Sequence, residues 1–339
     1  MLDGAPRLSR LVLNTANALL ALAAVVSTSA CGAAPTIVAP GDAASPLSLR
    51  RTIALPDVKG RIDHLAIDVE HQRLYVAEYG NGTVDEIDLK AGRVSGRIAG
   101  LKEPQGVGFL PKQQQIVVAS GDGSVRFYAA ADRREVARLQ LGDDADNVRI
   151  DARNGHVLVG YGSGGIATID PATHQLLSRL VLPGHPEGFR LIGSRAFVNV
   201  PDRGSVIVAD VDQVRVLAKW STGLNRLNFP LAVMPSGKDI AVVYRLPAKL
   251  SLMQADTGAS LSSRATCGDA DDLFLAGDTI LVVCGAGQVN VVASGKDVRV
   301  ATAPGARTGL FVPELKTLFV AAPSRVHPAA IWEFGLKGF

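Results

Sequence analysis

A short phrase, in which a polar residue leads into an apolar stretch, recurs seven times in this chain. Its first copy reads Asp63-His64-Leu65-Ala66-Ile67, and its second reads Gln105-Gly106-Val107-Gly108-Phe109. The seven copies of this repeat phrase begin at Asp63, Gln105, Asp146, Glu187, Asn228, Asp271 and Thr308. Consecutive copies begin 42, 41, 41, 41, 43 and 37 residues apart. A period in this range is typical of repeat architectures, in which each repeat is one supersecondary unit.

Glycine-rich turns divide each repeat into short stretches with β character. In the first repeat these are residues 65–68, 73–77, 83–88 and 94–98, rich in β-branched and aromatic side chains. No segment after the first thirty residues has a helical period over ten residues. Four short strands per repeat are typical of a propeller blade. The sequence therefore predicts an all-β fold, a seven-bladed β-propeller of four-stranded antiparallel blades.

The seventh repeat lacks one strand, and the N-terminal region can supply it. Only residues 317–321 and 330–335 are clear strands after the last repeat phrase, whereas residues 47–55 alternate and precede the first phrase. If these ends pair, the ring closes and no sheet edge is left open. We therefore predict one propeller over residues 47–339, with its last blade closed by the N-terminal strand. An open solenoid is the alternative, but no capping repeat is visible at either end.

Residues 1–30 are predicted to be a signal peptide. Arg7 and Arg10 give the segment a positive start, and residues 11–26 are mainly apolar. The small residues 27–30 form a cleavage region. The apolar stretch is too short and too polar for a transmembrane helix.

Residues 31–46 are rich in alanine, proline and glycine, and we predict a flexible tether. Cys31 directly follows the cleavage region, which resembles a bacterial lipoprotein signal in which the cysteine is lipidated. Thr28 departs from that pattern, which usually has Leu, Val or Ile at this position. Simple secretion after Ala30 or Ala33 is the alternative. Both predict an exported protein, either periplasmic or lipid-anchored to the bacterial envelope.

The two other cysteines are Cys267 and Cys284. In the repeat register, Cys267 precedes one repeat phrase and Cys284 ends the second strand of the same repeat, so both thiols are expected at one face. A disulfide between them is predicted in an oxidising compartment. Two small buried thiols are the alternative.

The repeats resemble those of a known family. Arg73-Leu74-Tyr75-Val76-Ala77, then Thr83-Val84 and Ile87-Asp88, resemble the YVTN-type repeat of secreted bacterial propellers, and residues 47–339 resemble YncE-like proteins at the repeat level. The resemblance implies an exported seven-bladed propeller, of a family often described as binding proteins without an established reaction. Such repeats are specific for fold and weak for function. A DNA-binding label also occurs in the family, but the formal charge of +3 argues against transferring it.

In a propeller the first strand of each blade lines the central channel, so the repeat phrases bring polar residues to one mouth. Neighbouring positions and the turns after the second strands add further polar groups. The predicted ligand-binding residues are Asp63, His64, Gln105, Asp146, Asn147, His185, Glu187, Asn228, Arg245, Asp271 and Arg307.

A ring of acids costs electrostatic repulsion unless positive charge compensates it. Ion pairs between these acids and Arg61, Arg226, Arg245 and Arg307 could supply the compensating positive charge. A divalent metal is another: carboxylate oxygens suit Ca²⁺, and histidine would extend the choice to Zn²⁺ or Mn²⁺. A third interpretation is that each polar residue only caps its own turn. The candidate metal ligands are Asp63, His64, Asp146, Glu187 and Asp271.

Three functions are compatible with these residues. The first is an exported binding or scaffold protein whose channel mouth binds a small polar ligand or an envelope protein partner. The second is a divalent-metal-dependent hydrolase or lyase, like the lactonases that use propeller channels, and the third is a purely structural module. A charge of +3 on 339 residues gives no electrostatic case for nucleic acid or an anionic membrane. A monomer is expected, with membrane contact only through an N-terminal lipid.

Overall fold

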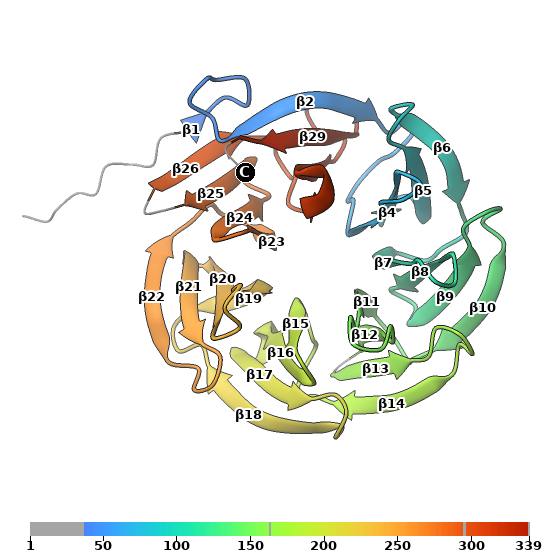
Figure 1. The fold of residues 1–339 in the computed structure, drawn as a ribbon, viewed down its shortest axis with the longest axis vertical. Helices are drawn as coiled ribbons and strands as arrows, with labels where there is room; N and C mark the ends of the chain where they lie inside the picture. The colour runs from blue at the N-terminus through green and yellow to red at the C-terminus, as the bar shows by residue number, and fades with distance from the viewer. Residues whose placement is uncertain (1–36, 163, 294–295, 338–339) are drawn as a thin grey trace, which may run out of the picture. The chain divides into compact units, whose positions relative to one another are not determined.

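Seven β-sheets stand as blades around a central channel (Figure 1). The computed structural model describes residues 37–162, 164–293 and 296–337. Six sheets have four strands and one has five. Within these residues the only helices are two short 3₁₀ turns, η1 (Pro201–Arg203) and η2 (Pro313–Leu315). The predicted seven-bladed propeller is therefore confirmed.

The blades follow one another in chain order, and each is built from the channel outward to the rim (Figure 1). Blade one contains β3 (Leu65–Asp68), β4 (Arg73–Glu78), β5 (Thr83–Asp88) and β6 (Arg93–Ile98). Blade two contains β7 (Pro104–Leu110), β8 (Gln115–Ser120), β9 (Ser124–Ala129) and β10 (Glu135–Gln140). Blade three contains β11 (Ala145–Ile150), β12 (Val157–Tyr161), β13 (Gly165–Ile169) and β14 (Leu176–Val181).

The same order holds in the second half of the ring. Blade four contains β15 (Phe189–Ile192), β16 (Arg195–Val200), β17 (Ser205–Asp210) and β18 (Arg215–Ser221). Blade five contains β19 (Arg226–Val233), β20 (Asp239–Leu246), β21 (Ala248–Gln254) and β22 (Ser260–Ala265). Blade six contains β23 (Ala270–Ala276), β24 (Thr279–Cys284), β25 (Gln288–Ala293) and β26 (Lys296–Ala301). Blade seven contains β27 (Gly309–Val312), β28 (Thr317–Ala322), β29 (Ala330–Leu336) and β2 (Leu47–Ala54).

Each blade is apolar on both faces because it packs between two neighbours. Successive side chains of a strand point to opposite faces. Along β4, Leu74 and Val76 therefore join a core that includes Phe319 of blade seven. Tyr75, between them, faces blade two, where its ring lies 5.8 Å from that of Phe109. Burying one such side chain stabilises the fold by about 1.5–3 kcal/mol.

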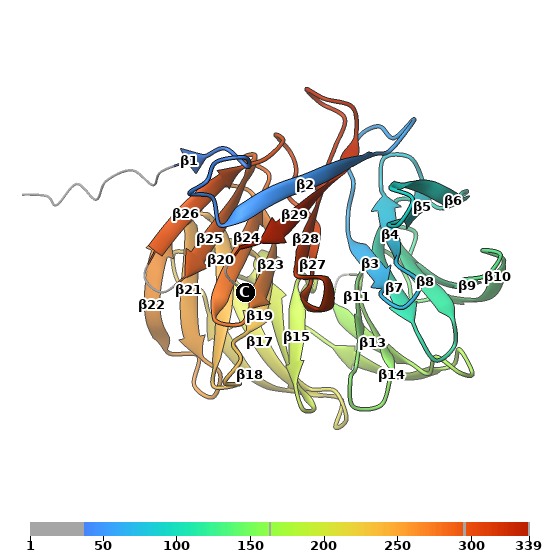
Figure 2. The same ribbon diagram turned by 45° about the horizontal axis from the view of Figure 1, so that its top comes forward.

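The N-terminal strand β2 completes blade seven, as predicted. It pairs antiparallel with β29, from Leu47 opposite Leu336 to Ala54 opposite Ala330. Figure 2 shows β2 lying along the outside of β29. Arg51 Nε also donates a hydrogen bond to Glu333 Oε2 at 2.5 Å. Since blades seven and one share a core, the array is a closed ring and not a solenoid.

The structure describes residues 37–46 of the segment predicted to be a flexible tether, and these residues contact the propeller. Ile37–Val38 form β1, which pairs parallel with β26 and makes blade six five-stranded. Leu49 N donates to Pro40 O, and Lys337 N donates to Pro46 O. Two β-branched residues thus pair with an otherwise open sheet edge, an interaction that composition alone does not reveal.

The predicted signal peptide and the lipidation candidate Cys31 lie outside the described residues. Among the residues that are described, no helix has the length and apolar character needed to cross a membrane.

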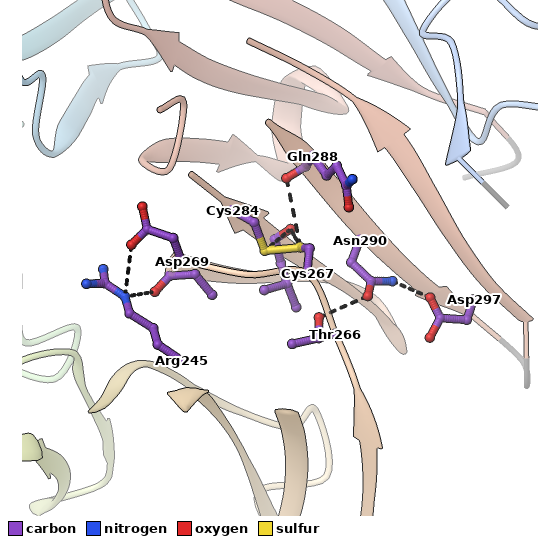
Figure 3. The surroundings of a disulfide bond; sticks show 10 residues. Arg245, Thr266, Cys267, Asp269, Cys284, Gln288, Asn290 and Asp297 are labelled. Atoms are coloured by element: carbon purple, nitrogen blue, oxygen red, sulfur yellow. Dashed lines mark hydrogen bonds and ion pairs between the residues drawn. A yellow bond between two sulfur atoms is a disulfide. The ribbon is translucent and has the colours of Figure 1, made fainter. Parts of the chain in front are cut away.

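The predicted disulfide between Cys267 and Cys284 is present (Figure 3). The two Cα atoms lie 5.9 Å apart, and both side chains are buried. Cys267 precedes β23 and Cys284 ends β24, so the bond joins the start of one strand to the end of its antiparallel neighbour. Disulfides persist mainly in oxidising compartments, which is the environment expected of an exported protein.

Candidate functional site

A polar cavity of about 310 Å³ opens at the mouth of the channel, and we call it the mouth chamber. Its walls come from the first six repeats, with Arg307 directly before the seventh repeat phrase. Its charged and imidazole side chains are those of Arg61, Asp63, His64, Asp144, Asp146, Arg149, His185, Glu187, Arg190, Arg245, Asp271, Asp272 and Arg307.

The repeat phrases reach this cavity because the first strands of the blades bulge there. The pairing of β7 with β8 shifts between Pro104 and Val107, and that of β11 with β12 shifts between Ala145 and Val148. Blades five and six carry shifts at equivalent places. A bulge leaves residues unpaired and re-aims a side chain. The bulges therefore release the polar residues of the phrases from the sheets.

Neighbouring first strands also approach each other closely at the phrase. His64 N donates to Gln105 O at 3.3 Å, which links blade one to blade two. A Cβ atom on Gly106 would lie 1.8 Å from Asp146 O. Only glycine fits between these two backbones.

On one side of the chamber, Asp271 is clamped between two arginines. Arg245 donates a hydrogen bond to Asp271 Oδ1, and Arg307 Nε lies 3.0 Å from Asp271 Oδ2. Arg245 Nε also donates to Ala270 O at 2.8 Å, and its guanidinium lies 3.7 Å from the centre of the Phe229 ring. Burial still raises the pKa of Asp271, although the arginines oppose this shift. Figure 3 shows Arg245 beside Asp269, a further carboxylate 3.4 Å away.

Asp63 is neutralised in the same way. It forms an ion pair with Arg61, whose guanidinium lies 4.7 Å from the centre of the Tyr79 ring. Burial raises the pKa of Asp63 well above its usual value, against the opposing effect of Arg61. Arg61, Arg245 and Arg307 thus pair with acids, as the sequence suggested. Arg226 pairs with no acid in the part of the chain that the structure describes, and its guanidinium donates to the carbonyls of its own turn.

Asp146 and Glu187 lie together on another side of the chamber. One ligand atom from each of Asp146, His185 and Glu187 lies within 4.8 Å of the others. Among the described residues, neither carboxylate forms an ion pair with an arginine, and the buried Asp146 Oδ1 has no hydrogen-bond partner. Burial is the main cause that raises the pKa of each acid to about 8. Neighbouring acids add to both shifts: Glu187 to that of Asp146, and Asp271 with Asp63 to that of Glu187.

His185 is oriented by the backbone. Its Nδ1 lies 2.6 Å from Gly162 O. Because a carbonyl oxygen can only accept a hydrogen bond, Nδ1 carries the proton, and in the neutral ring Nε2 carries the lone pair. Metal-ligating histidines usually donate their second ring nitrogen in this way.

His64 lies below these acids and is surrounded by carboxyl groups. Its Nε2 is 3.7 Å from Asp146 and 3.9 Å from Asp63, and its Nδ1 is 3.9 Å from Asp272. Burial nevertheless lowers its pKa to about 3, with a further contribution from Arg149. The imidazole is therefore neutral, and it separates the acids above it from the arginines below.

The remaining predicted residues divide into two groups. Gln105 lines the chamber and donates to Asp144 Oδ1 at 2.8 Å, and Asn147 accepts from Arg149 at 2.8 Å. Asn228 does not line the chamber. It is fully buried and donates to Asn199 Oδ1 and to Ser205 O, both at 2.9 Å. The bulge in blade five presents Phe229 to the channel instead.

The sequence analysis missed Arg149 and Arg190. Both stand at the fourth position of their repeat phrases. In the other five phrases this position holds Ala66, Gly108, Leu231, Phe274 and Phe311. Two arginines at a position that is otherwise apolar or glycine were the signal that could have identified them.

Comparisons with known proteins support the fold. No family model matches the chain, and no curated protein sequence matches it. Among solved structures, hydrazine synthase of Kuenenia stuttgartiensis is similar, with a TM-score of 0.70 over 81% of this chain and 97% of that one. At 14% sequence identity this similarity shows the fold alone. The resemblance to YVTN-type and YncE-like proteins stays a prediction.

Proposed function

We propose that this protein is an exported binding protein whose mouth chamber binds a small polar ligand through a positively charged group. One observation carries this proposal: Asp146 and Glu187 face an enclosed chamber without an arginine partner, whereas Asp63 and Asp271 have one. A buried carboxyl group without a partner is costly in its ionised form. An ammonium group placed between the two acids would supply the missing charge.

The rest of the chamber fits such a ligand. Arg61, Arg245 and Arg307 are each held by a carboxylate, and Arg61 and Arg245 also pack on aromatic rings, so they give the walls a defined shape. Gln105 and Asn147 add amide groups at the same level. A pocket of a few hundred Å³ with convergent polar groups is typical of small-molecule binding sites.

A thermal-shift screen of putrescine, spermidine, lysine and choline, followed by calorimetric titration, tests this proposal. We expect at least one of them to bind, and expect D146N and E187Q to abolish its binding. R226Q is the matched control, since Arg226 lies outside the chamber. If none of these cations binds, or if binding is the same in D146N and E187Q, the proposal is wrong.

A divalent metal ion is the second candidate, and the group formed by Asp146, His185 and Glu187 favours it. Two carboxylates and one imidazole suit Zn²⁺ or Mn²⁺ better than Ca²⁺, which prefers an all-oxygen shell. Such an ion would polarise a carbonyl or activate a water, which is the chemistry that a lactonase-like hydrolase or lyase needs. The protein residues would hold the ion and, through Gly162, keep the His185 ring in place.

Elemental analysis of protein purified without chelator separates the two candidates. Stoichiometric Zn²⁺ or Mn²⁺, lost in H185Q, would favour the metal site. H185Q should leave the binding of an organic cation largely intact, because His185 contributes no negative charge. A metal-free protein whose melting temperature ignores added Zn²⁺, Mn²⁺ and Ca²⁺ would exclude the metal-dependent enzyme.

Export is supported by the buried disulfide between Cys267 and Cys284. Mass spectrometry of the mature N-terminus tests whether the exported protein is lipid-anchored or freely secreted. A lipid-modified Cys31 would show envelope anchoring, an unmodified N-terminus after Ala30 or Ala33 would show free secretion, and an intact Met1 would contradict export.

A further inference from the structure

A second cavity, of about 370 Å³, lies in the channel beyond the mouth chamber, and we call it the lower chamber. Four residues line both cavities: His64, Arg149, Arg190 and Asp272. We call these four the arginine layer. Apart from them, the lower chamber is lined only by apolar residues and glycines, among them Val107, Ile150, Phe274 and Leu310.

Positive charge exceeds negative charge in the arginine layer. Within the described residues, no carboxylate lies within ion-pair distance of Arg149 or Arg190. Arg149 donates to the carbonyls of Val148 and Phe189 and to Asn147 Oδ1, and Arg190 donates to Phe189 O. These are neutral acceptors. Two guanidinium charges therefore stand side by side, enclosed by protein and open only to the channel.

The pKa shifts of the layer agree with incomplete compensation of these charges. Burial, followed by the charge of Arg190, lowers the pKa of Arg149 to about 9. Burial also lowers the pKa of Arg190. The charge of Asp272 acts on both arginines, but burial raises the pKa of Asp272 to about 7, and its Oδ2 already accepts a hydrogen bond from Gly309 N at 2.9 Å. His64 is neutral. The layer thus lacks the counter-charge that buried cations need.

We propose that the arginine layer binds the anionic head group of an amphiphile whose apolar chain occupies the lower chamber. Arg149 and Arg190 both donate to Phe189 O and both line the channel, so two guanidinium groups lie together there, and guanidinium suits a carboxylate or a phosphate. The apolar walls begin immediately below that point, at Val148 and Ile150, the neighbours of Arg149 on β11. A small inorganic anion would make no contact with the apolar walls of the lower chamber. A neutral apolar molecule would leave the charges of Arg149 and Arg190 unpaired.

This inference goes beyond the proposed function, because it concerns the other chamber and a ligand of opposite charge. The two proposals can therefore fail separately. E187Q should abolish the binding of an organic cation in the mouth chamber and leave the binding of an anionic amphiphile unchanged. Loss of both ligands in that variant would show that they share one site and would overturn the two-chamber assignment.

Calorimetric titration with octanoate, decanoate and monodecyl phosphate tests the proposal, with acetate, phosphate and decanol as matched partial ligands. We expect affinity to rise about fourfold for each CH₂ group added to the carboxylate, as burial of methylene groups predicts. Decanol and acetate should each bind at least about tenfold more weakly than decanoate, since each lacks one half of the interaction. Comparing decanoate with monodecyl phosphate shows which head group the layer prefers.

Three variants locate the site. R190Q should weaken decanoate binding about tenfold or more, the usual effect of losing a charged hydrogen-bond partner. D272N keeps an acceptor for Gly309 N and removes a negative charge, so it should tighten binding. I150N introduces a polar group at a partly exposed wall and should weaken decanoate without affecting acetate.

Circular dichroism and melting temperature will show that these variants are folded. D272N and R190Q shift affinity in opposite directions, so general damage to the fold cannot mimic the expected pattern. The proposal is wrong if decanol binds as tightly as decanoate, if affinity does not depend on chain length, or if R190Q and R149Q bind decanoate like the native protein. It is equally wrong if no anionic amphiphile binds at millimolar concentration.

Discussion

A carboxylate oxygen of Asp146 lies within 4.8 Å of one of Glu187, and no arginine among residues 37–162, 164–293 and 296–337 forms an ion pair with either acid. Burial, reinforced by the charge of Glu187, raises the pKa of Asp146 to about 8. The pair therefore retains protons at pH values where an exposed acid is fully ionised. This has consequences for stability and for ligand binding.

The stability of the protein should fall as pH rises from about 4 to about 8, and D146N should remove part of this fall. Asp146 and Glu187 ionise in the unfolded chain near their model values of 3.8 and 4.5 but only near 8 in the folded protein. Because their folded pKa is raised, the stability that they contribute is present at low pH and is lost as pH rises. At pH 8, D146N should be more stable than the native protein by at least about 1.4 kcal/mol, the equivalent of one pKa unit.

Urea denaturation at pH 4.5 and pH 8 measures this effect. The two proteins should have similar stability at pH 4.5. D278N, at an exposed position, is the control, and its free energy of unfolding should equal that of the native protein at both pH values. A difference between D146N and the native protein that is the same at both pH values would contradict the raised pKa.

Binding of putrescine in the mouth chamber should tighten as pH rises from 6 to 8 and then level off. A bound ammonium group favours the ionised carboxylates, so below pH 8 binding must release a proton. The dissociation constant should fall by up to about tenfold per pH unit for each proton released. Titrations in buffers with different ionisation enthalpies measure that number, and binding with no proton release would contradict the prediction.

Replacement of Gly106 by alanine should destabilise the protein and disturb the chamber. The new Cβ would lie 1.8 Å from Asp146 O and 2.8 Å from Val148 Cγ2, so blades two and three must separate locally. We expect a loss of about 3 kcal/mol, at the upper end of the usual cost of overpacking. G41A is the matched control, because its Cβ has no heavy atom within 4 Å. If G106A and G41A have the same midpoint in urea denaturation, the close approach of the backbones at Gly106 and Asp146 is contradicted.

Removal of the disulfide by C267A together with C284A should lower stability by about 3 kcal/mol. The bond closes a loop with a sequence separation of 17 residues, and cross-links of this span restrict the unfolded chain by about that amount. Guanidinium denaturation without reductant measures the loss, and C31A is the control with one thiol removed. Under reductant the native protein should approach the double variant. A double variant as stable as the native protein would show that the bond contributes nothing.

The fold could be predicted from the sequence because the same pattern is repeated. Each repeat carries the same polar-to-apolar phrase and the same turns, so errors in one repeat are corrected by the others. Even the closing strand Leu47–Ala54 was predictable, because the last repeat visibly lacked a strand. Ile37 and Val38 were not, because they belong to no repeat and pair with an edge that is apparent only in three dimensions.

The site was predictable as a ring but not as a set of contacts. Periodicity brings Asp63, Asp146, Glu187 and Asp271 to one cavity. It cannot tell which of them an arginine reaches, because that depends on how long side chains lie, and both arginines at Asp271 come from outside its blade. Asn228 has the same position in its phrase, yet the bulge beside it turns Phe229 toward the channel, and its amide satisfies buried groups between blades.

Arg51 and Glu333, which join β2 to β29, are separated by 282 residues. Blade seven therefore cannot assemble until the strand at the far end has been synthesised. Until then, the faces of blades one and six that pack against blade seven remain exposed to solvent. In a truncated polypeptide these faces would be accessible to proteases and chaperones. Only a chain that includes β29 can close the propeller ring. The topology therefore distinguishes full-length chains from truncated ones.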